Sequence, residues 1–205
     1  MSYDTIPNKE IVETTAQALR ERGLEVIIVA NRAEALEKIK EFIPKGASVN
    51  NGSSRTLKEI GLVDYLKSGT HGWNNLHAAV VAEKDPVQQA RARKEAMFAE
   101  YYMGSVHAVA QTGEIVIASG SGSQLSPIAF TSSHILFVVG TQKESPTYTS
   151  AMGRLREYVF PLEDKRVKDM GMRGATISKI LTFEREPAFM DRKVRIIFVN
   201  EKLGF

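Results

Sequence analysis

The chain has 205 residues, of which 43% are hydrophobic and 25% charged, the composition of a globular protein with a sizeable core. Its 27 basic and 24 acidic residues give a formal net charge of +3. That balance, without a basic block that contains interleaved aromatic residues, argues against a nucleic-acid partner. The chain has no cysteine, so disulfides, thiolate zinc sites, cysteine nucleophiles and cysteine-bound iron–sulfur clusters are excluded within it.

Targeting and metal-binding signals are also missing from the sequence. Residues 1–10 lack the apolar stretch of a secretory signal, and no apolar run approaches the roughly 18 residues that a transmembrane helix needs. The four histidines, His71, His77, His107 and His134, have no metal-ligand spacing. We therefore expect a cytoplasmic protein with no membrane partner, no bound metal and no redox cofactor.

The first part of the chain alternates between helix and strand patterns. Pro7 opens a helical pattern that Gly23 stops, and residues 24–30 form an apolar run typical of a strand buried on both faces. Asn31 and Glu34 then make a capping-box pattern at the start of a second helix. A strand followed by a crossover helix is the repeating unit of an α/β fold.

A small polar turn follows a short strand predicted at residues 47–50, and a helix is expected to begin at Arg55. Free N–H groups and the helix dipole make such a turn a candidate anion site. The alternative is that one serine simply caps the helix. The candidate ligand-binding residues of this turn are Asn51, Gly52, Ser53 and Ser54.

The middle of the chain is harder to interpret. Residues 68–75 contain the only tryptophan and are loop-like, which fits either a lid or a packed connection. Asp85 and Pro86 open a long helical pattern that we expect to extend to about Met103. A strand is expected at residues 105–110.

A turn, an apolar run at residues 114–118 and a loop of only Ser and Gly come next. Without bulky side chains, the backbone N–H groups of such a loop can approach an anion closely. Open α/β sheets bind ligands at Gly-rich loops that follow strands, although a flexible surface turn is the alternative. The candidate ligand-binding residues here are Thr112, Gly113, Ser119, Gly120, Ser121, Gly122, Ser123 and Gln124.

Residues 134–140 form the clearest buried strand, and further strands are expected at residues 178–183 and 194–199. The candidate ligand-binding residues at the end of the strand at 134–140 are Gly140, Thr141 and Lys143, of which Lys143 would reach an anion as a point charge. The alternative for Lys143 is a solvated loop lysine.

The strands at 25–30, 47–50, 105–110, 114–118 and 134–139 are expected to form the central, mainly parallel sheet. Loops that follow parallel strands meet at one sheet edge, so we expect the candidate segments to converge on one cleft. A carboxylate or phosphate is the natural guest of such a cleft.

Several segments together resemble the LUD-domain family, which includes lactate-utilisation protein C. They are residues 51–62 (NGSSRTLKEIGL), 110–114 (AQTGE), 138–143 (VVGTQK), 154–158 (RLREY), 161–166 (PLEDKR) and 203–205 (LGF). The resemblance extends from about residue 7 to the end, and implies a single LUD-type domain over residues 1–205. It also implies the superfold of ribose-5-phosphate isomerase, glucosamine-6-phosphate deaminase and CoA transferases. That is a three-layer α/β fold, an open and mainly parallel sheet with helices on both faces.

The functional implications of this resemblance are broader. Lactate-utilisation protein C is encoded with two iron–sulfur partner proteins and is needed to oxidise L-lactate to pyruvate, so a small anionic metabolite and iron–sulfur partners are expected. CoA transferases of the superfold use a glutamate nucleophile near a Gly-rich loop, which makes Glu114 a catalytic candidate; the alternative is a surface turn residue.

Two other functional classes remain open: a sugar-phosphate isomerase-like or CoA transferase-like enzyme, and a non-catalytic regulatory or partner-binding subunit. Homo-oligomerisation also remains open. The chain departs from a common form of the family at residues 120–124 (GSGSQ), where an arginine-containing step is expected.

Overall fold

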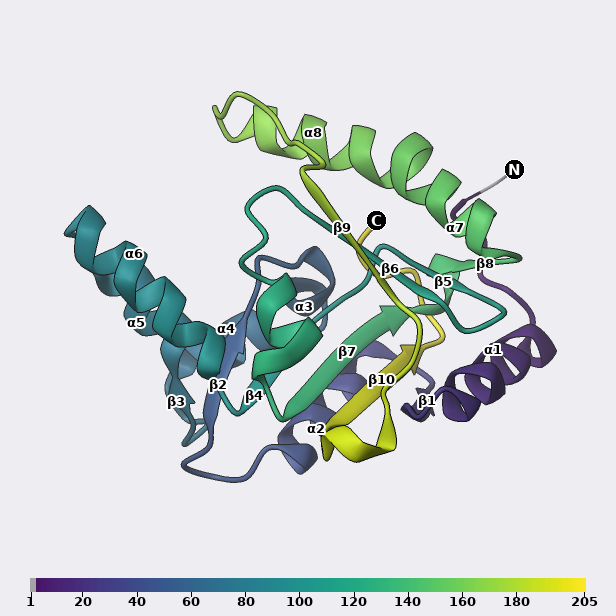
Figure 1. Ribbon diagram of the computed structural model, residues 1–205, viewed down its shortest axis with the longest axis horizontal. Helices are drawn as coiled ribbons and strands as arrows, with labels where there is room; N and C mark the ends of the chain where they lie inside the picture. Colours follow the sequence, from purple (N-terminus) through teal and green to yellow (C-terminus); the bar gives the residue numbers. More distant parts are fainter. Residues whose placement is uncertain (1–2) are drawn as a thin grey trace.

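A six-stranded, wholly parallel sheet forms the centre of the protein (Figure 1), in a computed structural model that describes residues 3–205. Every neighbouring pair in this sheet runs parallel. In spatial order the strands are β1 (Glu25–Val29), β10 (Lys193–Val199), β7 (His134–Gly140), β4 (Tyr101–Gly104), β2 (Ser48–Asn51) and β3 (Asn74–Asn75). The predicted α/β class and mainly parallel sheet are confirmed.

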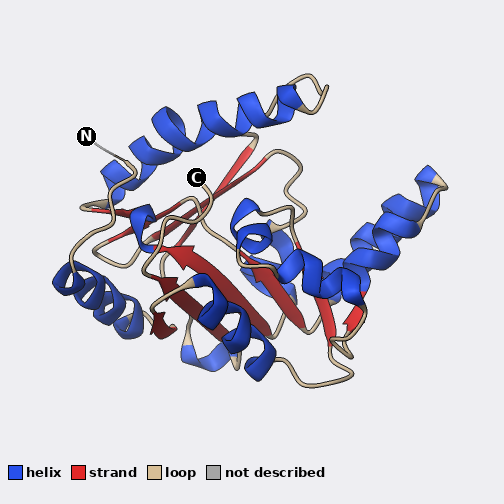
Figure 2. Cartoon of the chain, turned by 180° about the vertical axis from the view of Figure 1, so that it is seen from behind, coloured by secondary structure: helices blue, strands red, loops and turns tan. Residues whose placement is uncertain are grey.

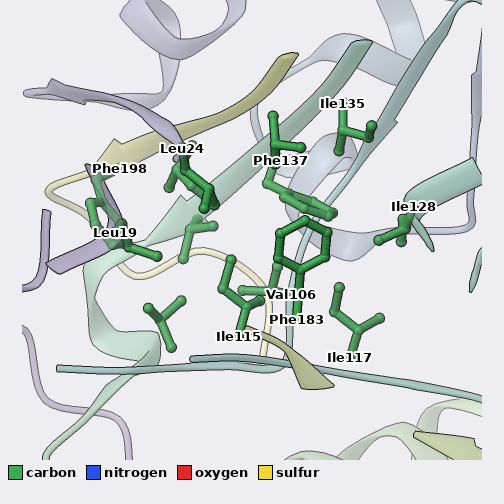
Figure 3. Close-up of a cluster of buried hydrophobic side chains, with 14 of the residues drawn as sticks. Leu19, Leu24, Val106, Ile115, Ile117, Ile128, Ile135, Phe137, Phe183 and Phe198 are labelled. Atoms are coloured by element: carbon green, nitrogen blue, oxygen red, sulfur yellow. The ribbon is translucent and has the colours of Figure 1, made fainter. Parts of the chain in front are cut away.

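The central strands are apolar at successive positions because both faces of the sheet are covered. In β7, Leu136 and Val138 belong to one hydrophobic cluster, whereas Ile135 and Phe137 belong to the other. Figure 3 shows part of the cluster that contains Ile135 and Phe137, where Phe137 lies beside Phe183 and Ile135. Alternate side chains of a strand point to opposite faces, so one continuous apolar run supplies two cores.

Helices cover one face of the central sheet and, along one edge, part of its opposite face. The helices α2 (Arg32–Phe42), α3 (Arg55–Glu59) and α4 (Leu62–Ser68) contribute buried residues to one cluster, and α1 (Lys9–Glu21) contributes to the opposite one. The pair α5 (Leu76–Ala82) and α6 (Pro86–Glu95) projects from the body beside β2 and β3 (Figures 1 and 2). Within residues 3–205, no helix is both long and apolar enough to cross a membrane.

A second, four-stranded sheet packs over the face that α1 helps to cover. Its order is β8 (Glu144–Ser145), β5 (Ala108–Ala110), β6 (Ile115–Ser119) and β9 (Lys179–Phe183), and β6 runs antiparallel to both of its neighbours. One continuous helical stretch covers its outer face (Figure 1): α7 (Tyr148–Gly153), the π-helical η4 (Arg154–Val159) and α8 (Phe160–Asp169). The short turns are η1 (Ala96–Phe98), the π-helical η2 (Pro127–Thr131), η3 (Thr141–Lys143) and η5 (Ala188–Met190).

Two sequence expectations about the middle of the chain were wrong. The helix expected to reach Met103 ends at Glu95, and β4 takes residues 101–104 into the central sheet. The apolar residues of this segment have helical spacing, but all four residues of β4 are buried and the strand pairs with a neighbour on each side. This pairing outweighs the local helical pattern. The strands expected at 105–110 and 114–118 are not central; they form the antiparallel hairpin β5–β6 of the second sheet.

Candidate functional site

A cavity of about 460 Å³ lies where the two sheets and the helix η4–α8 meet, and we call it the main cavity. This volume falls in the range of small-molecule sites in proteins. Its lining comes from residues 52–56, Tyr102, residues 104–107, 118–121 and 123–124, Lys143, the helix between residues 155 and 166, and residues 174–177 and 204–205.

The structure brings three of the predicted segments together at this cavity. The lining includes Gly52, Ser53, Ser54, Ser119, Gly120, Ser121, Ser123, Gln124 and Lys143. In the parallel sheet, β2, β4 and β7 all deliver the residues that follow them to one edge, as the sequence argument requires. The remaining predicted residues lie elsewhere: Asn51 faces a neighbouring cavity, Gly122 is set back in its loop, and Gly140 and Thr141 are buried beyond the lining.

The turn at Thr112 and Gly113 does not reach the main cavity. It joins β5 to β6, whereas the Ser/Gly loop follows the far end of β6, so an antiparallel hairpin holds the two at opposite ends. The Thr112 carbonyl instead accepts a hydrogen bond of 2.9 Å from Nε of Arg22, the residue that follows α1.

Glu114 lies beside this turn and pairs with the same arginine. Its Oε1 is 2.8 Å from Arg22 Nη2, and its Oε2 accepts a short hydrogen bond from the Thr112 hydroxyl. Burial acts to raise the pKa of Glu114, but the Thr112 and Arg22 bonds outweigh it and lower the pKa. The structure therefore places the predicted nucleophile in an ion pair outside the lining of the main cavity.

Lys143 lies at the base of the main cavity, with only 3% of its surface exposed. Its Nζ donates to Thr56 Oγ1 at 3.0 Å, Ser105 Oγ at 3.0 Å and the Val106 carbonyl at 3.2 Å. An ammonium group has three protons, so these acceptors match it fully. All three acceptors are neutral, and in the described part of the chain Lys143 has no ion pair with a carboxylate.

Burial lowers the pKa of Lys143 most, the Arg154 charge adds to this lowering and the Glu59 charge opposes it, which together leave the pKa at about 7. Glu59 acts from a distance because its own hydrogen bonds go to Arg55 and to the Gly204 backbone. Near neutral pH the ammonium and the free amine are therefore close in free energy.

A second buried cation, Arg154, lies behind the cavity wall at the start of η4 and is fully buried. Its guanidinium donates to three carbonyls: Tyr3 at 3.1 Å, Phe205 at 3.3 Å and, by a short bond, His107. Its other terminal nitrogen has no hydrogen-bond partner, and the group lies 5.2 Å from the centre of the Tyr158 ring. Burial lowers the pKa of Arg154 to about 10, which leaves it charged at neutral pH.

His107 lines the cavity as a neutral imidazole. Burial, and to a smaller extent the charges of Lys143 and Arg154, lower its pKa to about 3. Its Nδ1 accepts a hydrogen bond of 3.1 Å from the Ala118 backbone, so the proton of the neutral ring is on Nε2. His107, which has no metal-ligand spacing in the sequence, thus presents an N–H donor among the cavity residues.

The Ser/Gly loop has a shape that its own hydrogen bonds determine. The Gly122 N–H donates to Ser119 Oγ at 2.9 Å, and Gln124 Nε2 donates to the Ala118 carbonyl at 2.7 Å. Both bonds fold the loop back onto the end of β6, which leaves Gly120 exposed at the cavity wall.

Sequence reasoning did not identify several lining residues. Tyr102 was expected in a helix, and residues 174–177 carry no motif. Residues 204–205 belong to the LGF segment of the family resemblance, but they were not predicted to bind a ligand. The sequence signal at position 204 was the glycine itself. Gly204 has a φ of +67°, and an added Cβ would lie 2.4 Å from Thr56 Oγ1. Only glycine fits there, against a hydrogen-bond partner of Lys143.

The described residues contain no group of three or more His, Asp or Glu side chains arranged to hold a metal ion. The lining donors are instead a lysine, arginines, hydroxyls, a neutral histidine and glycine-rich backbone. This donor set suits an organic ligand that carries a negative charge.

Comparisons with known proteins give a family and a fold. The family model described as the LUD domain matches residues 12–199. A crystal structure of a DUF162 family protein from Deinococcus radiodurans superposes with a TM-score of 0.57 at 11% identity, covering 98% of this chain and 99% of that one. No curated protein matches the sequence significantly. At such low identity the structural likeness supports the fold alone, but the family model covers most of the sequence, and the chain belongs to the LUD-domain family.

Proposed function

We propose that the main cavity binds a small anionic metabolite, with Lys143 as its principal charge. The observation that carries this proposal is a buried lysine whose three hydrogen bonds all go to neutral groups. Lys143 is 3% exposed, and within residues 3–205 it has no ion pair. A buried charge without a counter-charge is strongly unfavourable, so an anionic guest would remove a cost that the free protein bears.

The acidic group on the cavity wall does not supply that counter-charge. Glu163 is engaged by Arg166 through two hydrogen bonds, of 2.7 and 2.6 Å. This bidentate pair is internally neutralised, whereas the charge on Lys143 remains available to a ligand. The hydroxyls of Thr56 and Ser105 hold the Lys143 ammonium in place, because each accepts from Nζ while donating its own proton to a backbone carbonyl, that of Leu203 or Val138.

A second candidate function is isomerisation or another proton transfer on such a ligand. It is favoured by the pKa of Lys143, about 7, because a general base is most effective when its pKa is near the working pH. Incubating ribose 5-phosphate with the protein in D₂O and following loss of its C2 proton signal by NMR tests this. Binding without exchange would leave a regulatory or carrier role as the function.

Lactate oxidation would make L-lactate the ligand and would require iron–sulfur partner proteins, since this chain has no cysteine. A three-carbon acid would fill only a small part of a 460 Å³ cavity. L-Lactate therefore belongs among the probes, and a larger anion is the expected better ligand.

Titration calorimetry with ribose 5-phosphate tests the binding proposal. Replacing Lys143 by Met should weaken binding by about 1–3 kcal/mol, within the about 4 kcal/mol by which two opposite unit charges about 4 Å apart attract at an effective dielectric constant of about 20. Lys67→Met is the matched control, because Lys67 is exposed on α4 and outside the cavity lining. Circular dichroism verifies that both variants are folded. Unchanged affinity in folded Lys143→Met would contradict the proposal.

A further inference from the structure

A second cavity of about 220 Å³ adjoins the main cavity on the side of the projecting helices α5 and α6. The two share five lining residues: Gly52, Ser53, Tyr102, Ser123 and Gln124. A shared wall of this extent makes the cavities two compartments of one hollow, with the turn after β2 and the end of the Ser/Gly loop between them.

Gly52 belongs to this shared wall. A Cβ added there would lie 2.8 Å from the Tyr102 hydroxyl and 3.3 Å from Gln124 Oε1. The φ of Gly52 is not in the left-handed region, so the backbone alone does not require glycine. The requirement comes from space: any side chain at this position would enter the region between the two compartments.

The second cavity has an unused acceptor. Asn51 lines it and is 7% exposed, and its Oδ1 has no hydrogen-bond partner, while its Nδ2 donates to the Gly52 carbonyl at 3.2 Å. A buried carbonyl oxygen without a donor costs free energy that a ligand N–H or O–H would recover. The side-chain amide is therefore arranged to accept from a guest.

The other walls of this compartment combine apolar and polar groups. Val80, Val81 and Met97 supply apolar surface, and Arg93 supplies a positive charge that lowers the pKa of His77 after burial has already lowered it. No described residue of this lining is acidic. Such walls suit a flat, uncharged head group that carries a hydrogen-bond donor and belongs to an anionic molecule.

We infer that the two cavities form one bipartite site for an elongated ligand of the nucleoside phosphate class. The phosphate would be in the main cavity near Lys143, and an amino-substituted base in the second cavity would donate to Asn51 Oδ1. This inference rests on the proposed function, whose anion it extends into a complete ligand. It also accounts for a feature that an anion site alone leaves unexplained, the unsatisfied Asn51 oxygen.

Calorimetry with three probes tests the inference. Ribose 5-phosphate fills the main cavity alone, AMP adds an adenine with its exocyclic amine, and purine riboside 5′-phosphate has the same ring without the amine. AMP should bind at least about tenfold more tightly than ribose 5-phosphate, since it buries a base and gains a hydrogen bond. Removing the amine should weaken binding about fivefold, the scale of one neutral hydrogen bond.

Variants assign the effect to the second cavity. Asn51→Ala should abolish the advantage of AMP over purine riboside 5′-phosphate. Gln88→Ala should preserve it, because Gln88 is exposed on α6 and lines neither cavity. A comparison of ligands within one variant does not depend on how stable that variant is.

The outcomes separate the two proposals. If ribose 5-phosphate binds with dependence on Lys143 but AMP binds no more tightly, the bipartite site is refuted and the anion site stands. If neither ligand binds, or binding ignores Lys143→Met, both are refuted. If AMP still binds more tightly than purine riboside 5′-phosphate in Asn51→Ala, the assignment of the base to the second cavity is also overturned.

Discussion

Replacing Lys143 by Met is expected to change how the stability of the protein depends on pH. Burial lowers the pKa of Lys143 from its ordinary value of 10.5 to about 7 in the folded protein. Between these two values the unfolded chain retains a lysine proton that the folded protein has released. The free energy of unfolding of the wild type therefore rises with pH in this window, and the methionine variant lacks that contribution.

The expected size of this effect follows from proton linkage. Each pH unit in the window is worth about 1.4 kcal/mol for one released proton. From about pH 7.5 to about pH 9 the folded lysine is mostly neutral and the unfolded lysine mostly charged. The wild type should therefore gain about 2 kcal/mol of unfolding free energy relative to Lys143→Met. Well below pH 7 both states hold the proton, and the difference between the two proteins should be constant.

Urea denaturation followed by far-UV circular dichroism at several pH values measures this difference. Subtracting the variant from the wild type cancels the titration of groups that both proteins share. Lys67→Met is the matched control, because it removes an exposed lysine of α4 that lies outside the cavity lining. A wild-type minus Lys143→Met difference that stays flat between about pH 7.5 and about pH 9 would refute the burial argument.

Three further predictions concern neighbouring groups. His107 should remain neutral with its proton on Nε2 from about pH 5 upwards, since its pKa is about 3; ¹⁵N NMR would reveal any titration near neutrality as a contradiction. Gly204→Ala should destabilise the protein by about 1–3 kcal/mol more than Gly46→Ala, measured by urea denaturation. Both glycines have positive φ, but only at Gly204 would the Cβ meet atoms within 4 Å, so equal losses would exclude the steric argument. Glu114→Gln should lower stability by about 1 kcal/mol through its pair with Arg22 and leave ribose 5-phosphate affinity unchanged in calorimetry; a loss of affinity would restore a role at the site.

The sequence alone determined the fold class and part of the site. Apolar runs such as residues 134–140, followed by small polar turns, predict strands buried on both faces of a parallel sheet, and the structure has that sheet. Parallel strands place their following loops at one edge, so Ser53 after β2 and Lys143 after β7 line the same cavity. Ser121 lines it too, but it follows β6 of the antiparallel second sheet, which this rule does not cover. The fold class was predictable because it depends on local pattern, and the meeting of the first two loops because it follows a general rule of chain geometry.

Only the tertiary structure decided which strands are neighbours and what surrounds each charge. The residues of β4 continue a helical pattern, yet pairing with β2 and β7 makes them a central strand. The placement of β5 and β6 in a separate antiparallel sheet takes Thr112 away from the cavity. Long-range pairing outweighs local propensity at such positions, and no local pattern encodes it.

The electrostatics of the site likewise depend on contacts between distant segments. Lys143 donates a hydrogen bond to Thr56, which lies far earlier in the chain. Arg154 donates to the backbone oxygens of Tyr3 and Phe205, which lie near opposite ends of the sequence. In sequence, Lys143 is an ordinary basic residue after a strand. Burial among neutral acceptors lowers its pKa, and burial is a property of the packed chain, which is why the sequence predicted a lysine at the cleft but not its unusual charge state.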